Sequence, residues 1–133
     1  MKLITRDTDY AVRALIYMAQ TKKKIVSATE LIEELRIPKP FLRKILQILN
    51  RKRILQSYKG QGGGFSLARP YGKIYLIDLI EIFQGPFVIN ECVFKKKICP
   101  NRSTCTLKSK LDYIEAKVVK ELEPVTIKSL MEL

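Results

Sequence analysis

Residues 27–69 read SATELIEELRIPKPFLRKILQILNRKRILQSYKGQGGGFSLAR, and this stretch decides the fold. Ser27 followed by Glu30 is the capping-box pattern of a helix start, and it predicts a short helix to about position 35. Pro38 ends that helix, because the residue before a proline is driven out of the helical region. Pro40 suits the first turn of a second helix, which we expect to run to about position 51. Two short helices joined by a tight turn predict a helix-turn-helix.

A glycine cluster follows the second helix. It lies between two short runs, residues 54–59 and 65–70, that are rich in strand-forming side chains. This arrangement predicts a β-hairpin, and its place directly after the second helix makes it a wing. A phosphate-cradling loop of a nucleotide enzyme is excluded, because no Gly-Lys-Ser/Thr sequence follows and no helix begins there.

Basic charge is concentrated in this module. The chain has 133 residues, a net charge of +12 and no histidine. No acidic residue occurs between Leu35 and Ile77, whereas a merely solvated surface mixes its signs. A polyanionic partner is therefore expected, and double-stranded DNA is the first candidate. The contacts are expected from the second helix and from a wing whose tip is flanked by Lys59 and Arg69. The candidate residues are Lys39, Phe41, Arg43, Lys44, Gln47, Lys59, Gly60, Gln61, Gly62 and Arg69.

The flanking segments predict a mainly α-helical chain. Apolar periodicity predicts helices over residues 6–20 and 75–83. Leucine, isoleucine and valine recur at steps of four and three through a polar helix of residues 107–122, which is the pattern of a seam that packs on a partner helix. We therefore expect a winged helix-turn-helix DNA-binding domain (residues 1–85), an ordered cysteine loop (86–105), and a dimerisation helix with a short amphipathic tail (106–133).

The cysteines are the chemically distinctive feature. Cys92, Cys99 and Cys105 are the only three in the chain, with the spacing C-x6-C-x5-C. An odd number of clustered thiols cannot all pair within one chain. The N-terminus lacks the apolar core of a secretory signal, which favours the cytoplasm, where clustered cysteines more often bind metal or do redox chemistry. The longest apolar runs are too short to span a bilayer. An anionic membrane surface is a second candidate partner for the basic charge, but it is not expected, because the basic residues cluster in the winged module rather than along one amphipathic helix.

The whole chain resembles the Rrf2 family of bacterial winged-helix regulators. The resemblance rests on the opening Met1-Lys2-Leu3, on Thr8-Asp9-Tyr10-Ala11-Val12-Arg13-Ala14-Leu15, on Gly62-Gly63-Gly64-Phe65-Ser66-Leu67-Ala68-Arg69 and on the spaced cysteines. It implies a homodimer that binds an approximately palindromic operator, with a repressor role expected, and a 4Fe-4S or 2Fe-2S iron–sulfur cluster held by the cysteines. No small-molecule substrate is implied.

The resemblance also implies the cluster ligands. Three family ligands fall on Cys92, Cys99 and Cys105. The iron–sulfur assembly regulator subgroup has a histidine three residues later, where this chain has Lys108, so the chain departs from that subgroup. The nitric-oxide-sensing subgroup instead uses an aspartate from the other subunit, and the matching position is Asp9, with Asp7 as the nearby fallback. An aspartate at a helix start also stabilises the helix dipole, so this structural role for Asp9 stays open.

The same subgroup comparison bears on DNA reading. The assembly regulator carries a glutamate where this chain has Arg43. Arginine reads guanine with two hydrogen bonds, whereas glutamate accepts one from cytosine, so a different operator is expected.

Two alternatives to an iron–sulfur cluster stay open for the cysteines. The cysteines could bind a structural zinc ion, with an aspartate completing the site. They could also act as a thiol-redox switch without metal, which Lys95, Lys96 and Lys97 beside Cys99 would favour. An enzyme is not expected, because the chain has no nucleophile–base pair and no catalytic motif. The signal that is sensed is expected to be nitric oxide, iron or redox state.

Overall fold

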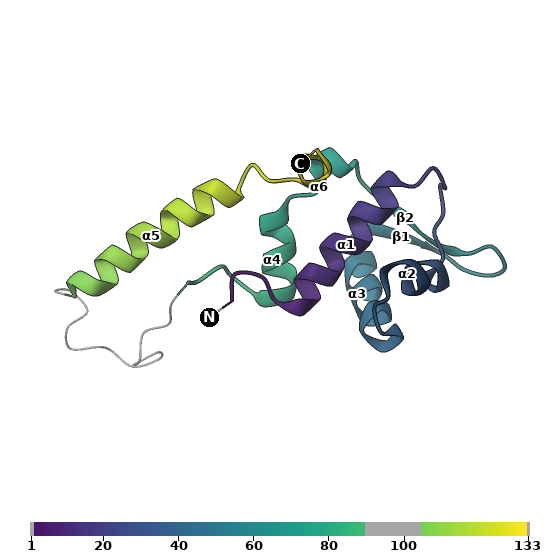
Figure 1. Ribbon diagram of the computed structural model, residues 1–133, viewed down its shortest axis with the longest axis horizontal. Helices are drawn as coiled ribbons and strands as arrows, with labels where there is room; N and C mark the ends of the chain where they lie inside the picture. The colour runs from purple at the N-terminus through teal and green to yellow at the C-terminus, as the bar shows by residue number, and fades with distance from the viewer. Residues whose placement is uncertain (1, 90–104, 133) are drawn as a thin grey trace.

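The computed structural model describes residues 2–89 and 105–132, and its architecture is a winged helix-turn-helix with a projecting C-terminal helix (Figure 1). Most of the chain is helical, and its one sheet is a two-stranded antiparallel hairpin in the described residues. This confirms the predicted fold class. The elements in chain order are α1 (Arg6–Gln20), α2 (Ala28–Leu35), α3 (Lys39–Arg51), β1 (Leu55–Tyr58), β2 (Gly64–Leu67), η1 (Tyr71–Lys73), α4 (Leu76–Gln84), α5 (Thr106–Leu122) and α6 (Ile127–Met131).

The helix-turn-helix begins and turns where the local sequence predicts. Ser27 Oγ accepts a hydrogen bond from the Glu30 amide at 3.1 Å and caps α2. Arg36 ends α2 in the left-handed region, with φ of 55°. Pro40 lies in the first turn of α3, where its missing N–H breaks no helical hydrogen bond. The turn between the two helices is thus set by short-range chemistry.

The capping box at Ser27 is only half formed, which corrects the sequence prediction. The Glu30 carboxylate does not return to the helix start. It instead accepts hydrogen bonds from Tyr17 Oη and Lys23 Nζ, each at 2.6 Å. These two bonds link α2 to α1 and to the intervening loop. The hydrogen bond from Tyr17 Oη to the Glu30 carboxylate raises the pKa of Tyr17 to about 12.

Glu30 gives the fold an acid-sensitive link. Its pKa lies below its ordinary value of 4.5, first because Lys23 donates to the carboxylate and then because Tyr17 does. A carboxylate whose pKa is lower in the folded than in the unfolded state stabilises the fold at any pH above its unfolded-state pKa. This stabilisation is lost as the pH falls through its folded-state pKa. We expect Glu30→Gln to lower Tm at pH 7 and to lessen the Tm loss on acidification from pH 5 to pH 3. Thermal unfolding of Glu30→Gln and of the exposed control Glu33→Gln over that range would test this; equal acid slopes in wild type and Glu30→Gln would contradict it.

The core lies where α1 packs against α3 and α4. Ala11, Ala14 and Leu15 of α1 are fully buried. The buried stripe of α3 faces them and consists of Leu42, Ile45, Leu46 and Leu49. Every buried position of α3 is therefore apolar, which leaves its polar side chains on the surface.

The wing pairs Leu55 with Leu67 and Tyr58 with Gly64, so residues 59–63 form its tip. Phe65 also exchanges two backbone hydrogen bonds with Val26, each 2.8 Å, which tie β2 to the segment before α2. This close approach requires glycine at position 64: a Cβ there would lie 2.4 Å from the Val26 carbonyl oxygen. The wing is thus anchored to the helix-turn-helix by backbone contacts.

The two C-terminal helices are placed very differently. Helix α5 projects away from the body, and α6 returns to it (Figure 1). The segment expected to be a tail is not a loose end, because Ile127 is fully buried in the core and its backbone amide donates a 3.0 Å hydrogen bond to the Ile74 carbonyl. Burial of Ile127 beside α1 therefore makes α6 part of the winged module. No helix in the described part of the chain is both long enough and apolar enough to cross a membrane.

Candidate functional site

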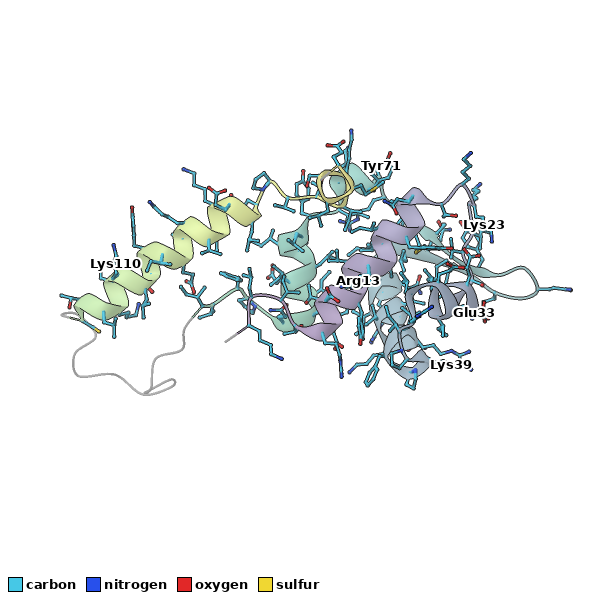
Figure 2. All side chains as sticks on the ribbon, in the orientation of Figure 1. Arg13, Lys23, Glu33, Lys39, Tyr71 and Lys110 are labelled. Carbon is cyan, nitrogen blue, oxygen red and sulfur yellow. The ribbon has the colours of Figure 1, made fainter. Side chains whose placement is uncertain are left out.

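Helix α3 presents the side chains predicted to contact DNA. The apolar stripe turns inward, so the polar side chains are left in solvent, and Figure 2 shows Lys39 at one end of the helix. Lys39, Arg43, Lys44 and Lys59 make no ion pair with any described residue. Their charge is therefore available to phosphate or to a base edge. All five predicted α3 residues are exposed: Lys39, Phe41, Arg43, Lys44 and Gln47.

An unexpected contact joins this surface to the first turn of α1. The Arg6 guanidinium carbon lies 4.1 Å from the centre of the Phe41 ring, and Phe41 is 37% exposed. This is a cation–π contact, which holds the charge of Arg6 beside the start of the recognition helix. No pattern in the sequence predicts this contact, because the two residues lie on different helices, 35 positions apart in the chain.

The wing residues divide into a tip and a base. Lys59, Gly60, Gln61 and Gly62 form the exposed tip, and Gly60 and Gly62 have positive φ of 90° and 77°. Arg69 does not flank this tip, contrary to the sequence interpretation, because β2 ends at Leu67 and position 69 is at the opposite end of the hairpin.

Arg69 lies instead at the foot of the wing. It lines an open hollow of about 510 Å³ together with Lys52, Asp78 and Glu81. Arg69 shares this hollow with two acidic side chains, so its surroundings are less positive than those of Lys59 at the tip. A DNA contact by Arg69 therefore stays a prediction.

The described residues contain two of the four candidate metal ligands. Cys92 and Cys99 lie outside the described residues. Cys105 is the N-cap of α5, and its Sγ accepts a hydrogen bond from the Lys108 amide at 3.3 Å. Amide hydrogen bonds to ligand sulfurs are one of the features that tune iron–sulfur clusters, so the setting of Cys105 suits a cluster ligand.

Asp9 lies in the first turns of α1 with its side chain 44% exposed. Its Oδ2 accepts a 2.8 Å hydrogen bond from Arg13 Nε, and this bond raises the pKa of Arg13. Asp9 thus has a partner within its own chain, as a helix-stabilising residue would. A carboxylate held this way has a second oxygen, so the ion pair and a metal bond are chemically compatible.

The two described candidate ligands are not brought together within one chain. Cys105 begins α5 at its outer end, whereas Asp9 is in the body of the molecule (Figure 1). Within residues 2–89 and 105–132, no group of three or more cysteine and acidic side chains gathers in one place. The thiol chemistry of Cys105 fits an iron–sulfur cluster, and Cys105 and Asp9 of one chain lie in different parts of the molecule.

Comparison with known proteins supports a regulator. Residues 4–133 match the family model described as Rrf2, iron-dependent transcriptional regulator. The regulator NsrR of Oceanobacillus iheyensis is 30% identical over 127 residues, covering 94% of this chain and 86% of that protein. Protein aau3 of Rhizobium meliloti is 34% identical over 109 residues, covering 81% of this chain and 71% of that protein.

Solved structures show the same fold. The chain is similar to CymR, described as the global cysteine regulator of B. subtilis, with a TM-score of 0.78 and 20% identity over 99% of this chain and 98% of that one. It is also similar to IscR of T. potens, with a TM-score of 0.75 and 21% identity over 99% of this chain and 87% of that one. The predictions of a DNA-binding regulator and of a chain that is not an enzyme are confirmed by the family match. This chain belongs to the Rrf2 family of iron-dependent transcriptional regulators.

Proposed function

We propose that the chain is a homodimeric repressor whose binding to an approximately palindromic operator is controlled by an iron–sulfur cluster that senses nitric oxide, iron or redox state. The observation that carries the proposal is the placement of Cys105. It is the last of three spaced cysteines, and it caps a largely exposed helix that follows a basic winged module. A group bound there would sit between the DNA-binding part and the helix suited to dimerisation.

The DNA-binding part of the proposal rests on helix α3 and the wing tip. A helix with a buried apolar stripe and exposed, unpaired cations can enter a major groove, where side chains at its start reach base edges. Lys59 on the wing tip would add a contact to phosphate, which contributes affinity and orientation without reading sequence. Helix α3 would therefore select the operator, while the wing would strengthen binding to any duplex.

The dimer rests on the unburied apolar side of α5. Leu107 is 67% exposed and Ile114 is 39% exposed, although both belong to the periodic seam that ends at the buried Leu122. Exposed apolar side chains at this spacing are typical of a helix that packs on a partner helix. A twofold pair of α5 helices would place two α3 helices for the two halves of a palindrome.

The cluster would be held by Cys92, Cys99 and Cys105 of one chain and Asp9 of the partner subunit. Thiolates are the common ligands of iron–sulfur clusters, and the chain has no histidine to replace one. Such a cluster supplies an iron that nitric oxide, oxygen or a chelator can remove when its fourth ligand is a carboxylate. The 30% identity with NsrR of Oceanobacillus iheyensis supports this subgroup over that of the assembly regulator.

A second candidate is a thiol-redox switch without metal. Cys105 Sγ already accepts a hydrogen bond from the Lys108 amide, and Lys95, Lys96 and Lys97 stand beside Cys99 in the sequence, where nearby cations favour a reactive thiolate. In that case oxidation of two cysteines to a disulfide, rather than loss of a cluster, would change the affinity for DNA.

Anaerobic purification with iron, sulfide and zinc analysis and a visible spectrum separates these candidates. A coloured protein with equal iron and sulfide, whose spectrum is lost on titration with nitric oxide together with a change in DNA affinity, supports the proposal. A colourless protein with stoichiometric zinc would overturn it in favour of a structural metal. A metal-free protein whose DNA binding responds to a mild oxidant would favour the thiol switch.

Sequence reading by the recognition helix is tested at Arg43. A bidentate arginine–guanine contact is worth about 1–3 kcal/mol, so Arg43→Ala should weaken binding to the operator by roughly 10-fold or more and relax the base choice at one position of each half-site. The measurement is binding to duplexes selected from a random pool by the wild type and then by the variant.

The matched control is Lys59→Ala on the wing tip. Loss of one phosphate contact should weaken binding to all sequences alike and reduce the slope of log affinity against log salt by about 1. An Arg43→Ala variant that behaves like Lys59→Ala, with base choice unchanged, would show that Arg43 contacts only the backbone.

A further inference from the structure

The last residue of α4, Gln84, holds the start of α1 in place. Its Oε1 accepts hydrogen bonds from the Thr5 amide at 2.9 Å and from Thr8 Oγ1 at 2.7 Å. Its Nε2 donates to the Leu3 carbonyl at 3.2 Å. We refer to these three bonds as the Gln84 clasp. Because an amide N–H can only donate and a carbonyl can only accept, the clasp determines which end of the Gln84 side chain is oxygen.

The clasp replaces interactions that α1 does not provide for itself. Thr5 is the N-cap of α1, yet its side chain makes no capping hydrogen bond. Thr8 is completely buried, and it is the one polar residue in the buried core of the described chain. A buried hydroxyl without a partner is costly, and the Thr8 hydroxyl donates to Gln84 while it also lies 3.3 Å from Thr5 Oγ1. Gln84 additionally accepts from the Thr5 backbone amide, 79 positions away in the sequence. Figure 1 shows the first turn of α1 beside the last turn of α4.

The Gln84 clasp lies between the segment that carries the cysteines and the helix predicted to read DNA, α3. On one side, Gly85 ends α4 with φ of 81° and Pro86 follows, so Gln84 is the last helical residue before the segment that carries the cysteines. On the other side, Arg6 lies between the clasped residues Thr5 and Thr8, and it stacks on Phe41 of the recognition helix at 4.1 Å.

We propose that Gln84 is a positioning residue that couples occupancy of the cysteine segment to the recognition helix, through the first turn of α1 and the Arg6–Phe41 contact. This inference rests on the proposed function and adds the route by which the two ends communicate. A shift of the chain after Gln84 would move or break the clasp, release residues 3–8, and withdraw Arg6 from Phe41. The start of α3 would then lose a support that holds its orientation toward DNA.

The first test uses cluster-free protein and does not depend on the cluster. Gln84→Met keeps the length of the side chain and its helix preference but removes both hydrogen-bonding ends. We expect backbone hydrogen exchange in residues 3–9 to become about 10-fold faster in this variant. Gln84→Glu keeps both acceptor bonds but loses the donation to Leu3, so its exchange should be intermediate. Gln20→Met, at the exposed far end of α1, is the matched control and should not change exchange there.

The second test measures coupling to DNA. The measured quantity is the ratio of operator affinities between protein reconstituted with iron and sulfide and cluster-free protein. Gln84→Met and Arg6→Ala should each shift this affinity ratio toward one by about 5-fold or more. The double variant should show no larger shift than either single variant, because both substitutions interrupt the same connection. If Gln84→Met fails to fold, Thr8→Val removes the key hydroxyl at constant shape and is expected to give the same reduced ratio.

The outcomes separate the two proposals. A wild-type ratio near one would overturn the proposed function, and the coupling with it. A large wild-type ratio that Gln84→Met leaves unchanged, while exchange in residues 3–9 rises, would overturn the coupling alone and leave the clasp as a stabilising contact. Additive losses in the double variant would overturn the route through Arg6.

Discussion

Cys105→Ser is expected to give a colourless, folded protein that no longer responds to nitric oxide. Serine can accept the Lys108 amide hydrogen bond that Cys105 accepts now, so the cap of α5 should be retained. A serine hydroxyl does not replace a thiolate as a cluster ligand, so the bound iron and sulfide should fall to near zero after anaerobic purification. The measurements are iron and sulfide content, the visible spectrum and helix content by circular dichroism.

The serine variant is more informative than an alanine variant at the same position. Alanine removes the cap together with the thiol, and loss of an N-cap costs about 1 kcal/mol. Ser109→Ala, one turn further along α5, is a matched control that should keep the full visible spectrum. A Cys105→Ser protein that retains the spectrum would exclude Cys105 as a ligand. A variant that unfolds although its cap is retained would point to a structural metal.

Gly64→Ala is expected to destabilise the fold by about 3 kcal/mol, equal to a fall in Tm of roughly 10 °C. The new Cβ would lie 2.4 Å from the Val26 carbonyl oxygen and 2.9 Å from Ser27 Cα, and both are backbone atoms that cannot turn away. The backbone at position 64 also has φ of 156°, which side chains rarely adopt. The wing should therefore separate from the segment before α2, with a loss of DNA affinity for all sequences.

Gly62→Ala is the control for this substitution. Gly62 also has a positive φ, 77°, but an added Cβ there would meet no atom within 4 Å. Its cost should be limited to backbone strain of about 1 kcal/mol. Thermal unfolding gives the loss of Tm for each variant. Gly64→Ala combines atomic crowding with backbone strain, whereas Gly62→Ala has backbone strain alone. Equal losses of stability would show that the wing is not anchored at Val26.

The helix-turn-helix and the wing were predictable because their signals are local. Ser27, Pro38 and Pro40 act within a few residues of where they stand, through a cap or through backbone sterics. The glycines at the wing tip act through their own φ angles. Such effects do not depend on the rest of the chain, so the predicted helix boundaries agree closely with those of the structure, whereas the second strand ends earlier than predicted, at Leu67.

The errors arose where a side chain had more than one possible partner. The Glu30 carboxylate could accept a hydrogen bond from the backbone at the start of α2, but it accepts hydrogen bonds from Tyr17 and Lys23 instead. Arg69 was assigned to the wing tip from its distance in sequence, whereas the strand register places it at the base. The C-terminal segment has an amphipathic pattern that fits a surface tail as well as a docked helix, and only the burial of Ile127 and the packing of α6 on α1 in the folded chain distinguish these possibilities.

The sequence was thus sufficient for the winged fold, the basic surface and the set of thiols, because each depends on residue type and short-range spacing. The folded chain was needed to reveal the Arg6–Phe41 stack and the Gln84 clasp, which join residues that are distant along the chain. A hydrogen bond over 79 positions has no periodicity and leaves no pattern in a single sequence. Packing of α1 against α3 and α4 is what brings such groups within reach of one another.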